Sequence, residues 1–300
     1  MKWYFGCNNQ SPGYEYLIKA AVESALKNTT LTPCFMYDGT PDHLTQWLIS
    51  KGVNVIYHRV SFYDELKAFY PEEKLHITTG TFLRCDIPIL EKEDDFVLYT
   101  DCDVLFLGEV VPPEIPATSC FACAPEARQD DWSVLNAGVM LMNLPLLRES
   151  HASFVDFIKG HLPELDTYDQ SAYNIIYKKS YAKLPLEYNW KPYWGMNTEA
   201  KILHFHGPKP VDILRMLEHK SVPDIYRLLF SFNRVGCIRY LAEFCKYSSH
   251  LEVDAEHALY AGMEFLEAEL NRHKQILKDK RKSRARRVWK KIRKSIRREK

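Results

Sequence analysis

Two aspartates one residue apart stand in the middle of an apolar, β-prone stretch, residues 96–106 of the chain. Asp101 and Asp103 follow Phe96-Val97-Leu98-Tyr99-Thr100 directly. Because this run lacks the alternation of a half-exposed strand, it predicts a buried strand with the aspartates at its carboxyl end. Side chains repeat every second residue along an extended backbone, so both carboxylates would point the same way. Two hard anionic oxygen ligands suit Mg²⁺ or Mn²⁺, and such an ion can hold a diphosphate.

The elements that must position these carboxylates alternate between strand and helix over the first hundred residues. That alternation favours an α/β fold with a parallel, doubly wound sheet, in which ligands bind at the carboxyl ends of strands. Further along, Asn136-Ala137-Gly138 interrupts an apolar strand and leaves room for something to approach the backbone. We expect strands at 3–8, 34–37, 53–57, 119–124 and 134–143, helices at 14–27, 44–50, 76–90, 151–161 and 168–178, and a helical region over 211–270.

Composition is that of a globular protein with a sizeable core. The chain has 300 residues, 46% of them hydrophobic, and no apolar run reaches the length of about 18 residues that a membrane span needs. Its first residues turn polar too soon for a signal peptide. The eight cysteines are scattered through apolar segments, and Cys120 and Cys123 suit a strand better than a zinc site. We therefore expect free, buried thiols in a reducing cytosol.

Charge is divided unevenly along the chain. Residues 271–300 carry 16 Lys and Arg against 2 Asp and Glu, whereas residues 1–270 have a net charge of −13. Within the tail, Val288, Ile292 and Ile296 recur every four residues beside Trp289. This spacing predicts a basic amphipathic helix over 284–300 that lies on an anionic membrane surface.

Several segments in one order, over about residues 3–210, resemble glycosyltransferase family 8, the retaining sugar-nucleotide transferases that include bacterial lipopolysaccharide galactosyl- and glucosyltransferases. Two of the matching segments contain Arg84 and the two aspartates. The others are Asn136-Ala137-Gly138, Asp169-Gln170, Leu184-Pro185 with Tyr188-Asn189, and His204-Phe205-His206-Gly207-Pro208-Lys209-Pro210. The resemblance implies a GT-A fold, a UDP-sugar donor, Mn²⁺ (Mg²⁺ being possible) and retention of anomeric configuration.

The resemblance also implies roles for individual residues. Asp101, Asp103 and His204 would bind the metal, with the histidine nitrogen favouring Mn²⁺ over Mg²⁺. Lys209 would contact the diphosphate, and Gly207 would let the backbone come close. Arg84 would reach the donor, and Asn136 and Ala137 would line the donor sugar. Asp169 would accept hydrogen bonds from the sugar hydroxyls, and Gln170 would help to shape the sugar pocket.

Gln170 matches the residue beside the anomeric carbon, on the face opposite the leaving group. Because glutamine is a poor nucleophile, same-face attack assisted by the leaving phosphate fits better than a covalent intermediate. An alternative for Asp169 is a helix cap, which is compatible with sugar binding. At the base, Asn8 would form hydrogen bonds and Tyr14 would stack.

These assignments divide the chain into a GT-A catalytic domain (1–210), a helical region packed on it (211–270) and a membrane-associating tail (271–300). We expect a metal-dependent hexosyltransferase acting on a glycan or glycolipid acceptor of lipopolysaccharide or capsule type. It would be cytoplasmic, peripheral on the inner membrane, with no nucleic-acid partner.

Two alternatives remain. In a haloacid-dehalogenase-type phosphatase, Asp101 would be the nucleophile and Asp103 the acid/base, but three strands precede the motif and no later acidic pair follows an apolar strand. In a nucleic-acid-binding protein the basic tail would bind, although the acidic globule would repel a polyanion.

Overall fold

A seven-stranded sheet lies at the centre of the molecule, in the order β3-β2-β1-β4-β7-β6-β8. The computed structural model describes residues 1–251 and 253–296, with Pro12 and residues 281–296 described as backbone only. β7 runs antiparallel to both of its neighbours, and the other six strands share one direction. The strands are β1 Lys2–Asn8, β2 Thr32–Asp38, β3 Asn54–Tyr57, β4 Phe96–Thr100, β6 Phe121–Pro125, β7 Leu135–Asn143 and β8 Tyr181–Lys183.

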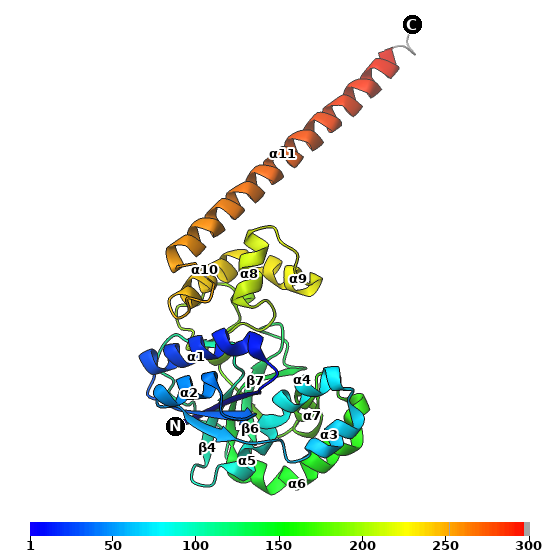
Figure 1. Cartoon of the computed structure of the whole chain (residues 1–300). Helices are drawn as coiled ribbons and strands as arrows, with labels where there is room; N and C mark the ends of the chain where they lie inside the picture. Colours follow the sequence, from blue (N-terminus) through cyan, green and yellow to red (C-terminus); the bar gives the residue numbers. More distant parts are fainter. Residues whose placement is uncertain (252, 297–300) are drawn as a thin grey trace.

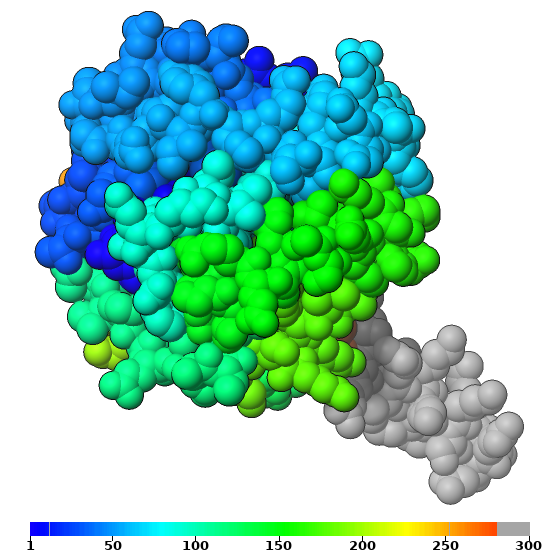
Figure 2. All heavy atoms as spheres, turned by 90° about the horizontal axis from the view of Figure 1, so that it is seen from below, coloured from blue at the N-terminus to red at the C-terminus, as the bar shows by residue number. Residues whose placement is uncertain are grey.

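Helices cover both faces of this sheet (Figure 1). One face packs against α1 Glu15–Asn28 and α2 His43–Ser50. The other packs against α3 Tyr63–Phe69, α4 Glu72–Phe82, α5 Ile87–Leu90, α6 Leu144–His161 and α7 Asp169–Ile176. Figure 2 shows, from below, how closely the N-terminal segments (blue) adjoin the segments coloured cyan and green.

The two cores follow from the pleat of the strands. Trp3, Phe5 and Cys7 of β1 lie in the core under α1, whereas Tyr4 lies in the core on the opposite face. β7 behaves in the same way, and all nine of its residues are buried. A strand buried on both faces needs a continuous apolar run, which explains why these sequences show no polar alternation.

A third core joins the C-terminal helices to the outer side of α1. These helices are α8 Pro210–Leu217, α9 Asp224–Phe232, α10 Arg234–Cys245 and α11 Ala255–Ile296. Only the first part of α11 contributes to this core; the helix then runs outward from the globule (Figure 1). It crosses residue 270, the expected boundary of the tail, without a break. No helix among the described residues is long and apolar enough to span a membrane.

Most of the expected elements are present, with three differences. The stretch 76–90, expected as one helix, is α4, a 3₁₀ turn over Leu83–Asp86, and α5. The apolar stretch 96–106 is also broken, because β4 ends at Thr100 and β5 Val104–Phe106 belongs to a separate two-stranded sheet with β9 Ile202–His204. The third difference is in the set of elements: α6 begins at Leu144 rather than at residue 151, and α3, β8 and β9 carry no strong periodic signal and were not expected.

Candidate functional site

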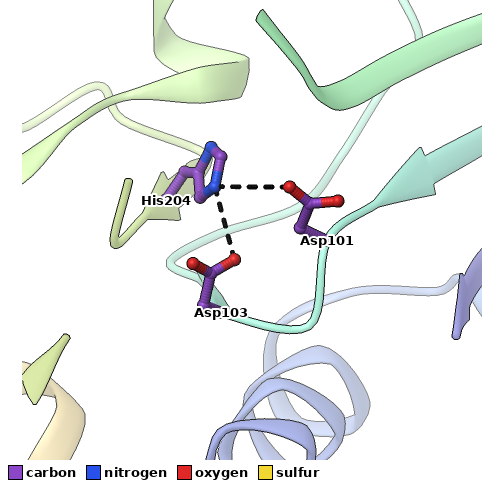
Figure 3. Close-up of side chains that lie close together, drawn as sticks. All are labelled: Asp101, Asp103 and His204. Carbon is purple, nitrogen blue, oxygen red and sulfur yellow. Dashed lines mark ion pairs between the residues drawn. The ribbon is translucent and has the colours of Figure 1, made fainter. Parts of the chain in front are cut away.

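Asp101, Asp103 and His204 converge at the carboxyl end of β4 (Figure 3). The chain bends at residues 102 and 103, so the carboxylates do not meet through the alternation of an extended strand. They meet because β5 pairs with β9, which places His204 opposite Val104. The Phe205 amide also donates to the Asp103 carbonyl at 2.9 Å. We call these three residues the Asp-Asp-His cluster.

Each carboxylate of the cluster has one oxygen held by a neighbour and one directed at His204. Tyr99 Oη (3.0 Å) and Arg84 Nη2 (2.9 Å) donate to Asp101 Oδ1. Lys209 Nζ donates to Asp103 Oδ2. The other oxygens, Asp101 Oδ2 and Asp103 Oδ1, lie 3.9 and 3.3 Å from His204 Nε2.

The residues of this cluster fit a divalent cation. Asp103 Oδ1 is buried and has no hydrogen-bond partner, which a buried carboxylate oxygen rarely tolerates without a ligand. Burial alone would raise the pKa of Asp103, but the Lys209 ammonium and His204 hold it well below its usual range. The His204 nitrogen lies 3.3 and 3.9 Å from the two carboxylate oxygens, separations that ligand bonds of about 2.1 Å can span.

Gly138 of β7 makes room for this cluster. A Cβ atom there would lie 2.3 Å from His204 Cε1 and 2.7 Å from Asp101 Oδ2. The expectation that the Asn-Ala-Gly interruption of the strand leaves space is confirmed, and the space adjoins the side chains of the Asp-Asp-His cluster.

The loop after β9 brings Lys209 back to the same place. Gly207 has φ +92°, a region that favours glycine, and its Cα faces Leu229 of α9. The Asp212 carboxylate accepts from the Lys209 backbone amide at 3.1 Å, which fixes the start of α8. Lys209 therefore reaches Asp103 from a fixed backbone.

Arg84 is buried at the centre of a charged group beside the cluster. Besides Asp101, it contacts the Ala137 carbonyl through Nη1 and lies 2.7 Å from Asp169 Oδ2 through Nε. The Nε–H donates to the Thr81 carbonyl instead (3.3 Å), so Asp169 Oδ2 accepts no hydrogen bond. Burial raises the pKa of Asp169 to about 6, although Arg84 opposes that shift.

Asp169 begins α7 and does not cap it. The residue before the helix is Tyr168, whose φ of 51° is unusual for a bulky side chain and marks local strain. The Asp169 side chain lies beneath Arg84 rather than among the cavity-lining residues. Its predicted contact with sugar hydroxyls stays a prediction.

Asn136, Ala137 and Gln170 contact one another beside the cluster but are not among the cavity-lining residues, and their contact with a sugar stays a prediction. Gln170 Oε1 accepts from the Ala137 amide at 2.9 Å and from Asn136 Nδ2 at 3.5 Å. The Gln170 carbonyl oxygen is thus engaged by the protein.

A cavity of about 520 Å³ opens from the Asp-Asp-His cluster toward the end of β1. Tyr14 lines it and is 42% exposed, which leaves its ring available for stacking. Asn8, by contrast, is buried, and its amide is used locally: Nδ2 donates to Thr79 Oγ1 at 2.9 Å, and Oδ1 accepts from Gln10 and Ser11. In the structure the Asn8 amide is therefore bonded to other residues of the protein. Its hydrogen bonding to a nucleotide base stays a prediction.

Sequence reasoning missed several residues beside the site. Glu126 accepts from Asn136 Nδ2 (2.8 Å) and pairs with His206 Nε2 (3.0 Å). Burial would raise the pKa of Glu126, but the bonds from His206 and Asn136 lower it to about 2. Asn189, which lies in one of the segments that carry the resemblance but received no role, contacts Asn136 and His204. No spacing in the sequence links these residues, and they meet only because β6, β7 and β9 adjoin.

The side chains of the expected membrane helix over 284–300 lie outside the described residues.

No protein-family model and no curated protein sequence matches the chain. Solved structures do match. The glycosyltransferase GlyE of Streptococcus pneumoniae TIGR4 has a TM-score of 0.56 at 18% identity, over 77% of this chain and 60% of GlyE. Galactosyltransferase LgtC, in complex with donor and acceptor sugar analogs, has a TM-score of 0.57 at 18% identity, over 76% of this chain and 100% of LgtC.

Mouse xyloside xylosyltransferase 1 is a third neighbour, with a TM-score of 0.50 at 13% identity over 68% of this chain and 97% of that protein. The chain spans only 60% of the length of GlyE. The likeness confirms the fold that the resemblance implied. The chain has the GT-A fold of these glycosyltransferases, with an Asp-Asp-His cluster at the end of its central strand.

Proposed function

We propose that this protein is a metal-dependent, retaining glycosyltransferase that moves a hexose from a UDP-sugar to a glycan or glycolipid acceptor. One observation carries the proposal. Asp101 Oδ2, Asp103 Oδ1 and His204 Nε2 meet beside Lys209 at a cavity of about 520 Å³, on a fold shared with glycosyltransferases. A cavity of this size suits a drug-sized ligand.

Mn²⁺, bound by the Asp-Asp-His cluster, would supply Lewis-acid stabilisation of the leaving diphosphate. Lys209 would move its ammonium group from Asp103 to a phosphate oxygen and act there as a point charge. Arg84 keeps Asp101 Oδ1 engaged, so that Oδ2 stays directed at the cluster. Tyr14 would stack on the base at the far end of the cavity.

Retention of configuration rests on Gln170 and its surroundings. Gln170 Oε1 already accepts from the Ala137 amide, and an amide is a weak nucleophile. Attack of the acceptor on the same face as the leaving phosphate therefore fits this site better than a covalent enzyme intermediate. One neighbour structure is of an active-site mutant of LgtC, in which a glutamine is changed to glutamate.

The acceptor and its place in the cell are part of the same proposal. A basic tail favours an anionic membrane surface, and a lipid-linked oligosaccharide or lipopolysaccharide core would meet the enzyme there. We propose a cytoplasmic enzyme held peripherally at the inner membrane by residues 284–300.

A thermal-shift screen of nucleotide sugars, with and without Mn²⁺, tests the donor. A donor that binds only the folded protein raises the melting temperature by mass action. We expect the largest shift with a UDP-hexose plus Mn²⁺, and no shift from any nucleotide sugar would contradict the proposal. Proton NMR of the first product then tests retention, because an inverted anomer excludes it.

A further inference from the structure

A chain of hydrogen-bonded side chains runs from the Asp-Asp-His cluster through buried asparagines to the partly exposed Glu126. His204 Nδ1 lies 3.0 Å from Asn189 Oδ1, and Asn189 Nδ2 donates to Asn136 Oδ1 at 2.8 Å. Asn136 Nδ2 in turn donates to Glu126 Oε2 at 2.8 Å. Asn189 and His204 have exposed fractions of 0% and 1%.

The far end of this chain fixes the orientation of every member. The Gly138 backbone amide can only donate, and it lies 3.2 Å from Asn136 Oδ1. The ionised Glu126 carboxylate can only accept, and it faces Asn136 Nδ2. The Asn136 amide therefore has one satisfactory orientation, and its oxygen faces Asn189.

This orientation propagates to the imidazole. Since Asn136 presents an oxygen, Asn189 must present its nitrogen there, and its own oxygen then faces His204 Nδ1. An oxygen requires a proton on Nδ1. The only nitrogen left for a cation is Nε2, the atom that lies 3.3 Å from Asp103 Oδ1.

The backbone holds Asn189 in this place. Its neighbour Trp190 forms a parallel bridge with Leu203, and the Trp190 carbonyl accepts from the His204 amide at 2.7 Å. Asn189 thus lies beside His204 through main-chain pairing as well as through its side chain.

We propose that Asn189 is a positioning residue that keeps the proton of His204 on Nδ1 and so presents the Nε2 lone pair to a divalent cation. The inference deepens the proposed function, because it rests on the metal site of the Asp-Asp-His cluster. Hydrogen-bond partners of metal-ligating histidines set ring orientation and basicity in this way.

The test measures metal affinity of the full chain, by titration with Mn²⁺ and with Mg²⁺ in the presence of UDP. Asn189→Leu removes the acceptor at Nδ1, and we expect Mn²⁺ affinity to fall by about 10- to 100-fold. The ratio of Mn²⁺ to Mg²⁺ affinity should also fall toward that of His204→Gln, because the nitrogen donor is what favours Mn²⁺. A purely structural role would leave that ratio unchanged.

Asn143→Leu is the matched control. Asn143 is a buried asparagine at the end of β7, and its Nδ2 donates to the Ser119 carbonyl at 3.1 Å, away from the cluster. This change should lower the melting temperature without altering metal affinity. Wild-type Mn²⁺ affinity in folded Asn189→Leu would overturn the inference.

Asn189→Asp covers the case in which the leucine variant does not fold. Its carboxylate accepts the same Nδ1–H but cannot donate to Asn136, so stability should fall while Mn²⁺ affinity stays at the wild-type level or above. A tenfold loss of Mn²⁺ affinity in this variant would contradict the inference. Mn²⁺ binding without sugar transfer, in contrast, would remove the proposed function and leave the role of Asn189 intact.

Discussion

The Asp-Asp-His cluster and the outer part of α11 are built in opposite ways. The cluster joins β4, the bend after it and β9, segments about a hundred residues apart, and Arg84 and Lys209 hold its two carboxylates from other elements. Residues 271–280 of α11 are all exposed, and the helix continues outward from there (Figure 1). Long-range packing thus determines the first region, whereas local helix propensity alone supports the second.

This difference separates what each region can do. Fixed, buried ligands can discriminate between ions and orient a substrate. An exposed basic helix can provide affinity for an anionic surface through the sum of many weak contacts, with no fixed geometry. The two regions should therefore respond independently to mutation.

The largest effect is expected from Asp103→Asn. The change keeps the size of the side chain but removes the charge that faces His204 and Lys209. Losing the metal site should lower transfer by about 1,000-fold, or about 4 kcal/mol in the barrier. Initial rates of UDP-sugar hydrolysis and of transfer measure this loss.

Asp38→Asn is the control for this variant, because Asp38 is a buried aspartate at the end of neighbouring β2, paired with Arg59 and not among the cavity-lining residues. It should keep its activity. Full activity of Asp103→Asn in excess chelator would contradict the metal assignment.

The second prediction concerns the tail. A chain ending at Leu270 should no longer float with anionic vesicles, because it lacks the 16 Lys and Arg of residues 271–300, each worth about 1 kcal/mol near such a surface. Its melting temperature and its sugar transfer to a soluble acceptor should not change. Vesicle flotation at low and high salt, with neutral vesicles as control, measures this. Equal flotation of both chains would exclude the tail as an anchor.

The contrast between long-range packing and local propensity also explains how much of each region could be predicted from the sequence. Asp101, Asp103 and the apolar strand before them are adjacent in sequence, so local pattern was enough to find them. His204, Lys209 and Arg84 came from an ordered resemblance, and the structure brings them together. Local pattern gave a wrong reason for the convergence of the carboxylates, because the break between β4 and β5 depends on pairing with β9.

Glu126 could not be found from the sequence, and Asn189 lay in a segment that carries the resemblance but received no role. Each is a common polar residue outside any periodic pattern, and its contacts depend on strands that adjoin only in the folded chain. Asn8 shows the reverse case: the resemblance placed it at the base, and the structure directs its amide to Thr79 of α4 and to the loop that follows it.

The third prediction tests the space that Gly138 leaves beside the cluster. In Gly138→Ala, the new Cβ would approach His204 Cε1 and Asp101 Oδ2 too closely, so the cluster must shift. Mn²⁺ affinity should fall by about 10-fold or more, which is about 1.4 kcal/mol. Gly160→Ala in α6 meets nothing within 4 Å and should leave Mn²⁺ affinity unchanged. Calorimetric titration compares the two, and wild-type affinity in Gly138→Ala would show that the ligands tolerate displacement.

The smallest effect is expected from Lys191, a buried cation behind the cluster. Its side chain is fully buried, donates to the Pro125 carbonyl at 2.8 Å and lies 4.2 Å from the centre of the Trp194 ring. Burial lowers the pKa of Lys191 to about 7, from its ordinary value of 10.5. Between these two values the unfolded chain binds more protons than the folded one, so this lysine makes stability rise with pH over that interval.

Below about pH 7, Lys191 is charged in both states and its burial costs the most. Lys191→Met removes the charge at similar length, so its stability relative to wild type should be highest near pH 6 and should decrease by about 4 kcal/mol by pH 10. Lost hydrogen bonding to Pro125 lowers this relative stability by about 1 kcal/mol at every pH and does not change the slope. Urea unfolding at a series of pH values measures the difference in stability between the variant and the wild type.

Lys183→Met is the control, because Lys183 lies over Trp132 at the surface. Its difference in stability from the wild type should not change with pH. A flat profile for Lys191→Met as well would mean that the buried lysine stays protonated throughout, held by the nearby Glu126 carboxylate.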